Sequence, residues 1–329
     1  ITGCETSESR KSLQQTGVAQ VANNEPRYHH VVPQFFLRNF AVNEECTRIA
    51  TVAKEGDMAI WMERSIGSLG FERDFYVHIS DGRPISVETQ INRTIETPIS
   101  QSDTWAKIAS GRTSELDRSD RAILYALVRH LEARTPHYLE TANELSAMAR
   151  DPDSDMPFTD EEREMYAMMR SNPEFAKYMF NAMATKKFDE RSFDSAMILV
   201  AHSPIILRTS TTPTMAAPSP RHDAMALPLP GQVPYQLTLT VNPHTLVSVI
   251  LGDFDGHFAN TDMEQEIAIG INRTFALQFS HFPKVRHLVS NRDRLVEDMT
   301  WAPYALISDT PKKIVFKRTV TDSSSDPKG

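Results

Sequence analysis

The sequence predicts a mainly helical α+β fold: a central helical bundle with small, mostly antiparallel β elements packed against it. Apolar residues recur at helical spacing through the middle of the chain, from residue 86 to residue 134. Short β-like runs precede this region, and others follow residue 205. Helices that are segregated from strands in this way favour α+β over a doubly wound sheet, in which the two would alternate.

The N-terminal elements follow from local signals. Pro33 suits the first position of a helix because it has no N–H to leave unpaired there, which predicts a helix over 33–41. The β-like runs 47–53 and 58–62 flank Glu-Gly-Asp and predict a hairpin. A further strand is expected over 75–79.

Two long helices are expected in the middle of the chain. The first covers 86–108, where Pro98 predicts a kink because it lacks an N–H and its ring clashes with the preceding turn. The second begins near Leu116 and is the clearest in the chain, and Pro136 marks its end.

The C-terminal half mixes helices and strands. A Thr-x-x-Glu capping box predicts a helix over 159–170, and apolar spacing predicts another over 262–279. The expected strands are 205–209, 236–241, 245–251, 285–289 and 313–318.

Composition predicts one compact domain over residues 27–320, with a disordered leader at 1–26 and a disordered tail at 321–329. The 329 residues carry a net charge of −8, which argues against non-specific coating of nucleic acid, since that mode needs many Lys and Arg. No apolar run approaches the roughly 18 residues of a membrane span.

Cysteine usage indicates a reducing compartment. The chain has only Cys4 and Cys46, so neither a disulfide framework nor a cysteine metal knuckle is expected, and the cytoplasm is the predicted location. The alternative is a lipid anchor at Cys4, because residues 1–4 resemble the end of a lipoprotein signal whose charged and apolar parts are missing.

Polar residues in unusual places give the candidate site. His29 and His30 precede the first helix in an extended stretch, and either imidazole can ligate a metal or act as a base. Glu88 and Glu96 lie eight residues apart on one stripe of the next helix, so they can hold a divalent ion or divide acid and base roles. The candidate metal ligands are His30, Glu88 and Glu96. The alternative is a solvated helix face, or an ion pair with Arg134.

His130 and Arg134 fall on the apolar stripe of the clearest helix, with Ile123 and Leu127. An Arg at such a position needs a carboxylate partner, for which Glu96 and Glu88 are the leading candidates. The guanidinium can instead grip a phosphate or carboxylate ligand.

The segment His29-His30-Val-Val-Pro-Gln-Phe-Phe-Leu-Arg-Asn-Phe40 resembles the opening signature HHxVPxxYLRxF of the domain-of-unknown-function family 4238. Further segments follow in the order of that family and extend the resemblance over residues 27 to 290. They are Asp74-Phe75-Tyr76, Glu88 with Glu96, Arg134-Thr135-Pro136, Arg208-Thr209-Ser210 before Pro213, Leu227-Pro228-Leu229 and the helix with Asn272.

The sequence departs from the family pattern at two positions. Thr211 stands where the family has Asp, and His130 stands where it more often has Gln. The resemblance implies a fold and a set of candidate residues, but no reaction. If the family uses that Asp in catalysis, the substitution by Thr211 puts activity in doubt.

Two functions remain open. In the first, the chain is a hydrolase of a phosphorylated or nucleic-acid substrate. Its catalytic site comprises His29, His30, Glu88, Glu96, His130 and Arg134, with an optional divalent metal. In the second, the chain is a non-catalytic binding or interaction module, and the same residues form a buried structural network. An open cleft favours the first function, and a closed, paired network favours the second.

Overall fold

The computed structural model describes residues 28–80, 82–134, 159–171, 177–178, 181–182, 190–218 and 235–319. The predicted leader and tail lie outside these residues, so the division into leader, domain and tail stays a prediction. None of the helices in the described part of the chain is both long and apolar enough to cross a membrane.

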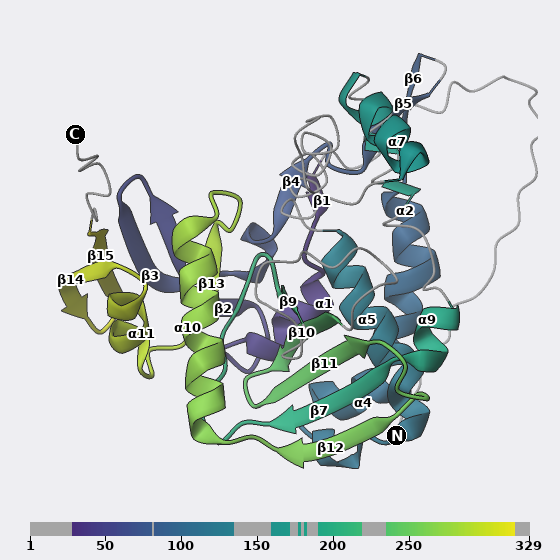
Figure 1. Ribbon diagram of the computed structural model, residues 1–329. Coiled ribbons are helices and arrows are strands. Elements are labelled where there is room, and N and C mark those ends of the chain that lie inside the picture. Colours follow the sequence, from purple (N-terminus) through teal and green to yellow (C-terminus); the bar gives the residue numbers. More distant parts are fainter. Residues whose placement is uncertain are drawn as a thin grey trace, which may run out of the picture.

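A five-stranded sheet forms one layer of the molecule, with the strand order β12-β7-β11-β10-β9 (Figure 1). Neighbouring strands are antiparallel except β12 and β7, which are parallel. Helix α5 (Arg121–Ala133) packs across this sheet, where Leu124 and Leu127 share a core with Leu239 and Val247. The strands are β7 (Met197–His202), β9 (Thr214–Pro218), β10 (Tyr235–Asn242), β11 (Thr245–Leu251) and β12 (Phe258–Asp262).

A six-stranded sheet has the order β14-β15-β3-β2-β13-β8. Its β2–β3 pair confirms the hairpin predicted around Gly56, which adopts a φ of +66° in the turn. The strands are β2 (Arg48–Glu55), β3 (Met58–Ser65), β8 (Thr209–Ser210), β13 (His287–Val289), β14 (Tyr304–Thr310) and β15 (Lys313–Arg318).

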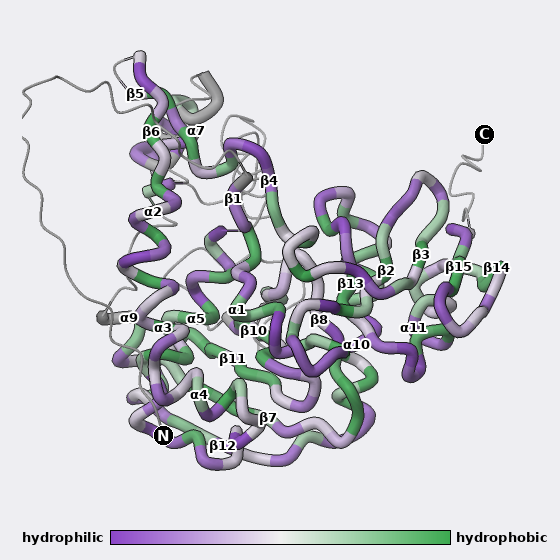
Figure 2. Tube along the Cα trace, turned by 180° about the vertical axis from the view of Figure 1, so that it is seen from behind, coloured by the Kyte–Doolittle hydropathy of each residue, from purple (hydrophilic) through white to green (hydrophobic). Residues whose placement is uncertain are grey.

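Helix α10 (Gln265–His281) joins the two large sheets. Its N-terminal half places Ala268 in a small core with Ala201 and Leu246 of the five-stranded sheet. Its C-terminal half buries Phe275 and Phe279 against the six-stranded sheet and helix α11 (Leu295–Trp301). Seen from behind, hydrophobic segments gather around β7, β11 and the neighbouring helices (Figure 2).

The N-terminal signature folds into a short strand and a helical turn. Strand β1 (Tyr28–His30) pairs with β4 (Phe71–Arg73), and Val31 and Val32 donate to the carbonyl of Gly70. Gly70 is required at this crossing, because a Cβ there would lie 2.9 Å from the Cβ of Val32 and its φ is +63°. The remaining short elements here are α1 (Gln34–Leu37), η1 (Arg38–Phe40), η2 (Ile66–Ser68), β5 (Val77–Ser80) and β6 (Arg83–Ser86).

The helix predicted over 86–108 is divided into pieces. Helix α2 (Glu88–Ile91) runs into a π-helical turn, η3 (Asn92–Glu96), where the Thr97 N–H bonds to the carbonyl five residues earlier. Pro98 then lies in the first turn of α3 (Thr97–Ser100), where a missing N–H costs least. Ser102 caps a separate helix, α4 (Asp103–Ala109), by accepting from the Trp105 N–H.

The prediction of a mainly helical fold around a central bundle is wrong. The described residues form four sheets, and the two large ones, rather than a bundle, carry the core. Strands β7, β12 and β14 lack a clean alternation of apolar and polar residues. Strand β7 is a nearly continuous apolar run that buries Val200 and Ala201 in two different cores, whereas β12 has no buried residue and β14 buries only Tyr304. The strand predicted over 205–209 is also wrong, since β8 covers only two residues. The remaining elements are η4 (Thr113–Glu115), η5 (Arg118–Asp120), α7 (Asp160–Ser171) and α9 (Glu190–Ser195).

Candidate functional site

The two signature histidines project to opposite sides of β1, as side chains of successive strand residues do. His29 is completely buried, and its Nδ1 accepts from the Tyr76 N–H at 2.8 Å, so its ring proton is on Nε2. Its ring stacks on Tyr76 with centroids 5.6 Å apart. His30 is half-buried, and its Nε2 lies 2.9 Å from the Gln34 amide nitrogen. Burial and the nearby Arg134 charge lower the pKa of His30.

Arg134 is the centre of the site and is completely buried at the end of α5. Its Nε donates to the Tyr76 hydroxyl at 2.7 Å, and its Nη2 donates to the His30 carbonyl. Its Nη1 pairs with the Glu96 carboxylate and lies 3.0 Å from His130 Nε2. We call this set the Arg134 network: Tyr76, Glu96, His130, Arg134 and the carbonyl of His30. It joins β1 and the 74–76 turn to two helical segments.

His130 is held neutral inside this network. Its Nε2 lies 3.0 Å from Arg134 Nη1 and 3.5 Å from the Glu96 carboxylate. One nitrogen cannot accept from the first and donate to the second, so we assign the shorter contact and place the ring proton on Nδ1. Burial lowers the pKa of His130 to about 3. The contact with Glu96 is therefore not an ion pair at neutral pH.

Glu88 is buried beside the network and is less completely paired. Its Oε2 is enclosed without a hydrogen-bond partner among the described residues. Burial raises the pKa of Glu88, while the Arg134 charge and a hydrogen bond from the His30 backbone lower it. Such an unpaired carboxyl, with its charged form disfavoured, is typical of functional sites and also occurs in structural networks.

A metal site does not form from the expected ligands in this structure. Within the described ranges, no group of three or more His, Cys, Asp or Glu side chains is placed to hold a metal ion. Glu96 is bound to Arg134, and His30 points its Nε2 toward Gln34.

The structure therefore places four of the other five predicted residues, His30, Glu88, Glu96 and His130, around Arg134. The fifth, His29, contacts the network through Tyr76. Sequence reasoning did not select Tyr76 as a site residue. It is completely buried, and burial raises its pKa to about 12, so it is a neutral hydrogen-bonding phenol. The one signal in the sequence was its place in the Asp74-Phe75-Tyr76 segment. In the structure, Asp74 adopts a φ of +51° and turns the chain inward.

A family model described as "Protein of unknown function (DUF4238)" matches residues 28–266. The chain belongs to this family. Neither the curated proteins nor the solved structures contain a match to it. In this DUF4238 protein the matched range begins at β1, includes the whole Arg134 network and ends in the first turn of α10.

Arg208, which lies inside the matched range, and Asn272, which lies beyond its end, meet in a second buried arginine site. Arg208 is completely buried and pairs with Asp298 at 2.7 Å. The Asn272 amide accepts from the Arg208 N–H at 2.8 Å and donates to the Ile206 carbonyl at 2.9 Å. Asn272 therefore fastens α10 to the chain that enters β8.

Thr211, where the resemblance implies Asp, lies in a structural position. The Thr211 hydroxyl accepts from the backbone N–H groups of Arg286 and His287, at 3.2 and 3.3 Å. These contacts hold the start of β13 against β8. An Asp at this position can accept the same two bonds, so the change to Thr keeps the contact that the structure makes there.

Proposed function

We propose that this chain is a non-catalytic binding module whose Arg134 network is a structural element of its core. The observation that carries the proposal is the enclosure of Arg134: the residue is completely buried and each of its three guanidinium nitrogens already contacts a group of the chain itself. A guanidinium engaged in this way has little capacity left for a phosphate or carboxylate ligand.

The structural role of the Arg134 network is tested by measuring the thermal stability of variants. Removing one partner of a buried ion pair typically costs about 3–5 kcal/mol, because the other charge is left without compensation. Glu96→Ala should therefore lower the melting temperature strongly. Glu63→Ala removes a carboxylate of similar reach from an exposed pair with Arg48, and it is the matched control. Equal melting temperatures for the two variants would reject a structural role for the network.

A hydrolase acting on a phosphorylated or nucleic-acid substrate is the second candidate. It is favoured by one observation, the unpaired Glu88 Oε2 beside the half-buried His30. In this proposal Glu88, whose pKa is raised, acts as the acid, and His30 acts as the base. Arg134 and Glu96 would then position the pair without contacting substrate.

The second candidate is tested by hydrolysis of a phosphomonoester, a phosphodiester and single-stranded DNA, with and without added Mg²⁺ and Mn²⁺. Loss of turnover in both Glu88→Gln and His30→Gln, with unchanged melting temperatures, would support the hydrolase. The exposed His281 provides a control in His281→Gln. Turnover that survives in both variants would refute this acid–base pair.

A reducing compartment, the cytoplasm, remains part of the proposal. Cys46 is exposed and is a free thiol in the described part of the chain. Exposed free thiols persist most readily in reducing surroundings.

A further inference from the structure

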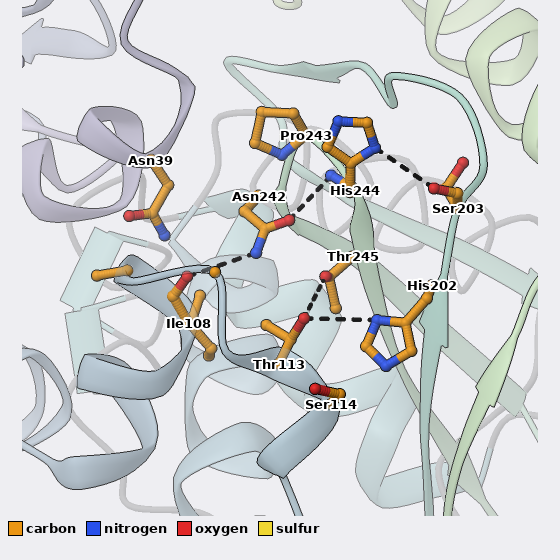
Figure 3. Close-up of a pocket in the computed structure, with 12 residues that line it drawn as sticks. Asn39, Ile108, Thr113, Ser114, His202, Ser203, Asn242, Pro243, His244 and Thr245 are labelled. Atoms are coloured by element: carbon orange, nitrogen blue, oxygen red, sulfur yellow. Dashed lines mark hydrogen bonds between the residues drawn. The ribbon is translucent and has the colours of Figure 1, made fainter. Parts of the chain in front are cut away.

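A polar pocket of about 410 Å³ lies at one end of the five-stranded sheet, away from the Arg134 network (Figure 3). It is formed where the C-terminal end of α4 and η4 meet the turn between β10 and β11. Its volume is in the range of small-molecule sites, which is roughly 300–1,000 Å³. Its lining includes Asn39, Thr113, His202, Ser203, His244 and Thr245.

A chain of hydrogen bonds fixes the ring of His202 in this wall. The Asn260 amide nitrogen donates to the carbonyls of Thr113 and Leu116, at 3.1 and 3.0 Å, so its Oδ1 is an acceptor. That oxygen lies 2.6 Å from His202 Nε2, which must carry the ring proton. His202 Nδ1 is consequently an acceptor.

The donor and acceptor roles assigned at His202 also fix those of the Thr113 and Thr245 hydroxyl groups. The Thr113 hydroxyl lies 3.4 Å from His202 Nδ1, to which it donates. Its oxygen lies 2.8 Å from the Thr245 hydroxyl, which must then be the donor of that pair, because Thr113 has only one proton. Thr245 therefore retains its oxygen lone pairs as acceptors at the pocket (Figure 3).

Two further groups leave acceptors at the pocket. The Asn39 amide nitrogen donates to the Val241 carbonyl at 2.9 Å, which leaves its Oδ1 without a partner among the described residues. His244 is exposed at the mouth, and its Nδ1 lies 3.4 Å from the Ser203 carbonyl, to which only an N–H can donate. When His244 is neutral, its Nε2 is then an acceptor.

As the described residues define it, the pocket lining contains no Asp, Glu, Lys or Arg. Arg112 and Glu115, which flank the lining residues Thr113 and Ser114 in the chain, pair with each other at 3.0 Å. A charged ligand would therefore lose hydration without gaining an opposite charge, which is costly. Acceptors without charge match a neutral ligand that is rich in hydroxyl donors.

We propose that this pocket binds a small neutral polyhydroxylated molecule, of the size of a monosaccharide or a cyclitol. Its hydroxyl groups would donate to Thr245 and His244. The proposal rests on the binding function proposed above and gives that function a site and a ligand class.

The test is a titration of the full chain, labelled with ¹⁵N in its histidine rings, followed by nuclear magnetic resonance. The probes are myo-inositol and three compounds with related skeletons but different charges: glucose, gluconate and glucosamine. We expect myo-inositol or glucose to shift the ring signals of His202 and His244 saturably, and to bind more tightly than the two charged compounds. His244→Ala should weaken the binding at least five-fold.

The matched control is His281→Ala, because His281 is also exposed and its Nδ1 also contacts a backbone carbonyl, that of Leu277. This variant should bind like the parent. The proposal is overturned if neither neutral probe shifts the two rings at about 50 mM, if a charged compound binds more tightly, or if His244→Ala binds unchanged. All proteins in this test keep Arg134 and Glu96, so the ligand class can fail while the structural role of the network stands, and the reverse.

Discussion

The Arg134 network and the pocket beside His202 are both built from polar side chains of distant segments. They differ in how many of their hydrogen-bonding groups are already bonded within the protein. In the network, a charged guanidinium is completely buried and its nitrogens are bound within the chain. In the pocket, histidine, threonine and asparagine side chains are held in one orientation by hydrogen bonds and keep acceptors available. The difference teaches that a charge taken out of water must be compensated by the protein itself, whereas neutral groups can be left for a ligand.

The largest effect that separates the two regions is expected for Arg134→Met. Methionine fills similar space but leaves the Glu96 carboxylate and the His30 carbonyl without their donor. We expect a loss of about 3–5 kcal/mol in the free energy of unfolding, measured by urea denaturation. Arg48→Met, in an exposed ion pair, should cost less than about 1 kcal/mol. Similar costs for both would remove the contrast between network and surface.

The protonation of His130 gives the next largest effect. Its folded pKa of about 3 lies below the ordinary 6.5, so stability is fully present above 6.5 and is lost as the pH falls toward 3. At pH 5 the loss from this one group is about 2 kcal/mol. His130→Gln, whose amide does not take up a proton in this pH range, should remove this part of the loss. Because His287, with a pKa lowered to about 4, is present in both proteins, its contribution cancels in the comparison. If the stabilities of the parent and of His130→Gln change in parallel between pH 7 and pH 5, His130 is not a buried neutral base.

A smaller effect is expected at Thr211, which, like the Arg134 network, is buried and bonded within the protein. Thr211→Val should destabilise the fold by about 1–2 kcal/mol, because two backbone N–H groups at the start of β13 lose their acceptor. Thr211→Asp keeps an acceptor and should lose less, as measured by thermal unfolding. If the Val variant is as stable as the parent, position 211 is not the structural contact that we describe.

The smallest effect is expected at Glu88, whose Oε2, like His130 Nδ1, is buried without a hydrogen-bond partner among the described residues. Its folded pKa is raised, so its contribution to stability is present at low pH and is lost as the pH rises through the folded value. Glu88→Gln stays neutral and should gain stability relative to the parent as the pH rises from 4 to 8. Urea denaturation of both proteins at pH 4 and pH 8 measures this difference in stability. A difference that shrinks with rising pH would contradict a raised pKa of Glu88.

Much of the candidate site was accessible from local patterns. The helical spacing of Leu127, His130 and Arg134 predicts that one face of α5 turns inward, and the helix indeed buries all three residues. An arginine on such a face requires a carboxylate, and the prediction that Glu96 supplies it is met by the contact in the structure. The pocket gave no such signal, because its residues are ordinary in type and come from segments up to about 200 positions apart.

The sequence by itself determined the hairpin of β2 and β3, the inward face of α5, the membership of the DUF4238 family and the need to pair a misplaced charge. These properties depend on neighbours within a few residues, or on a linear motif. Only the tertiary structure decided that two sheets replace the expected bundle, that Glu88 keeps an unpaired oxygen and that the pocket opens beside His202. Strand pairing and cavity shape arise from contacts between distant segments, whose free energy depends on what covers each face, and no local period encodes that.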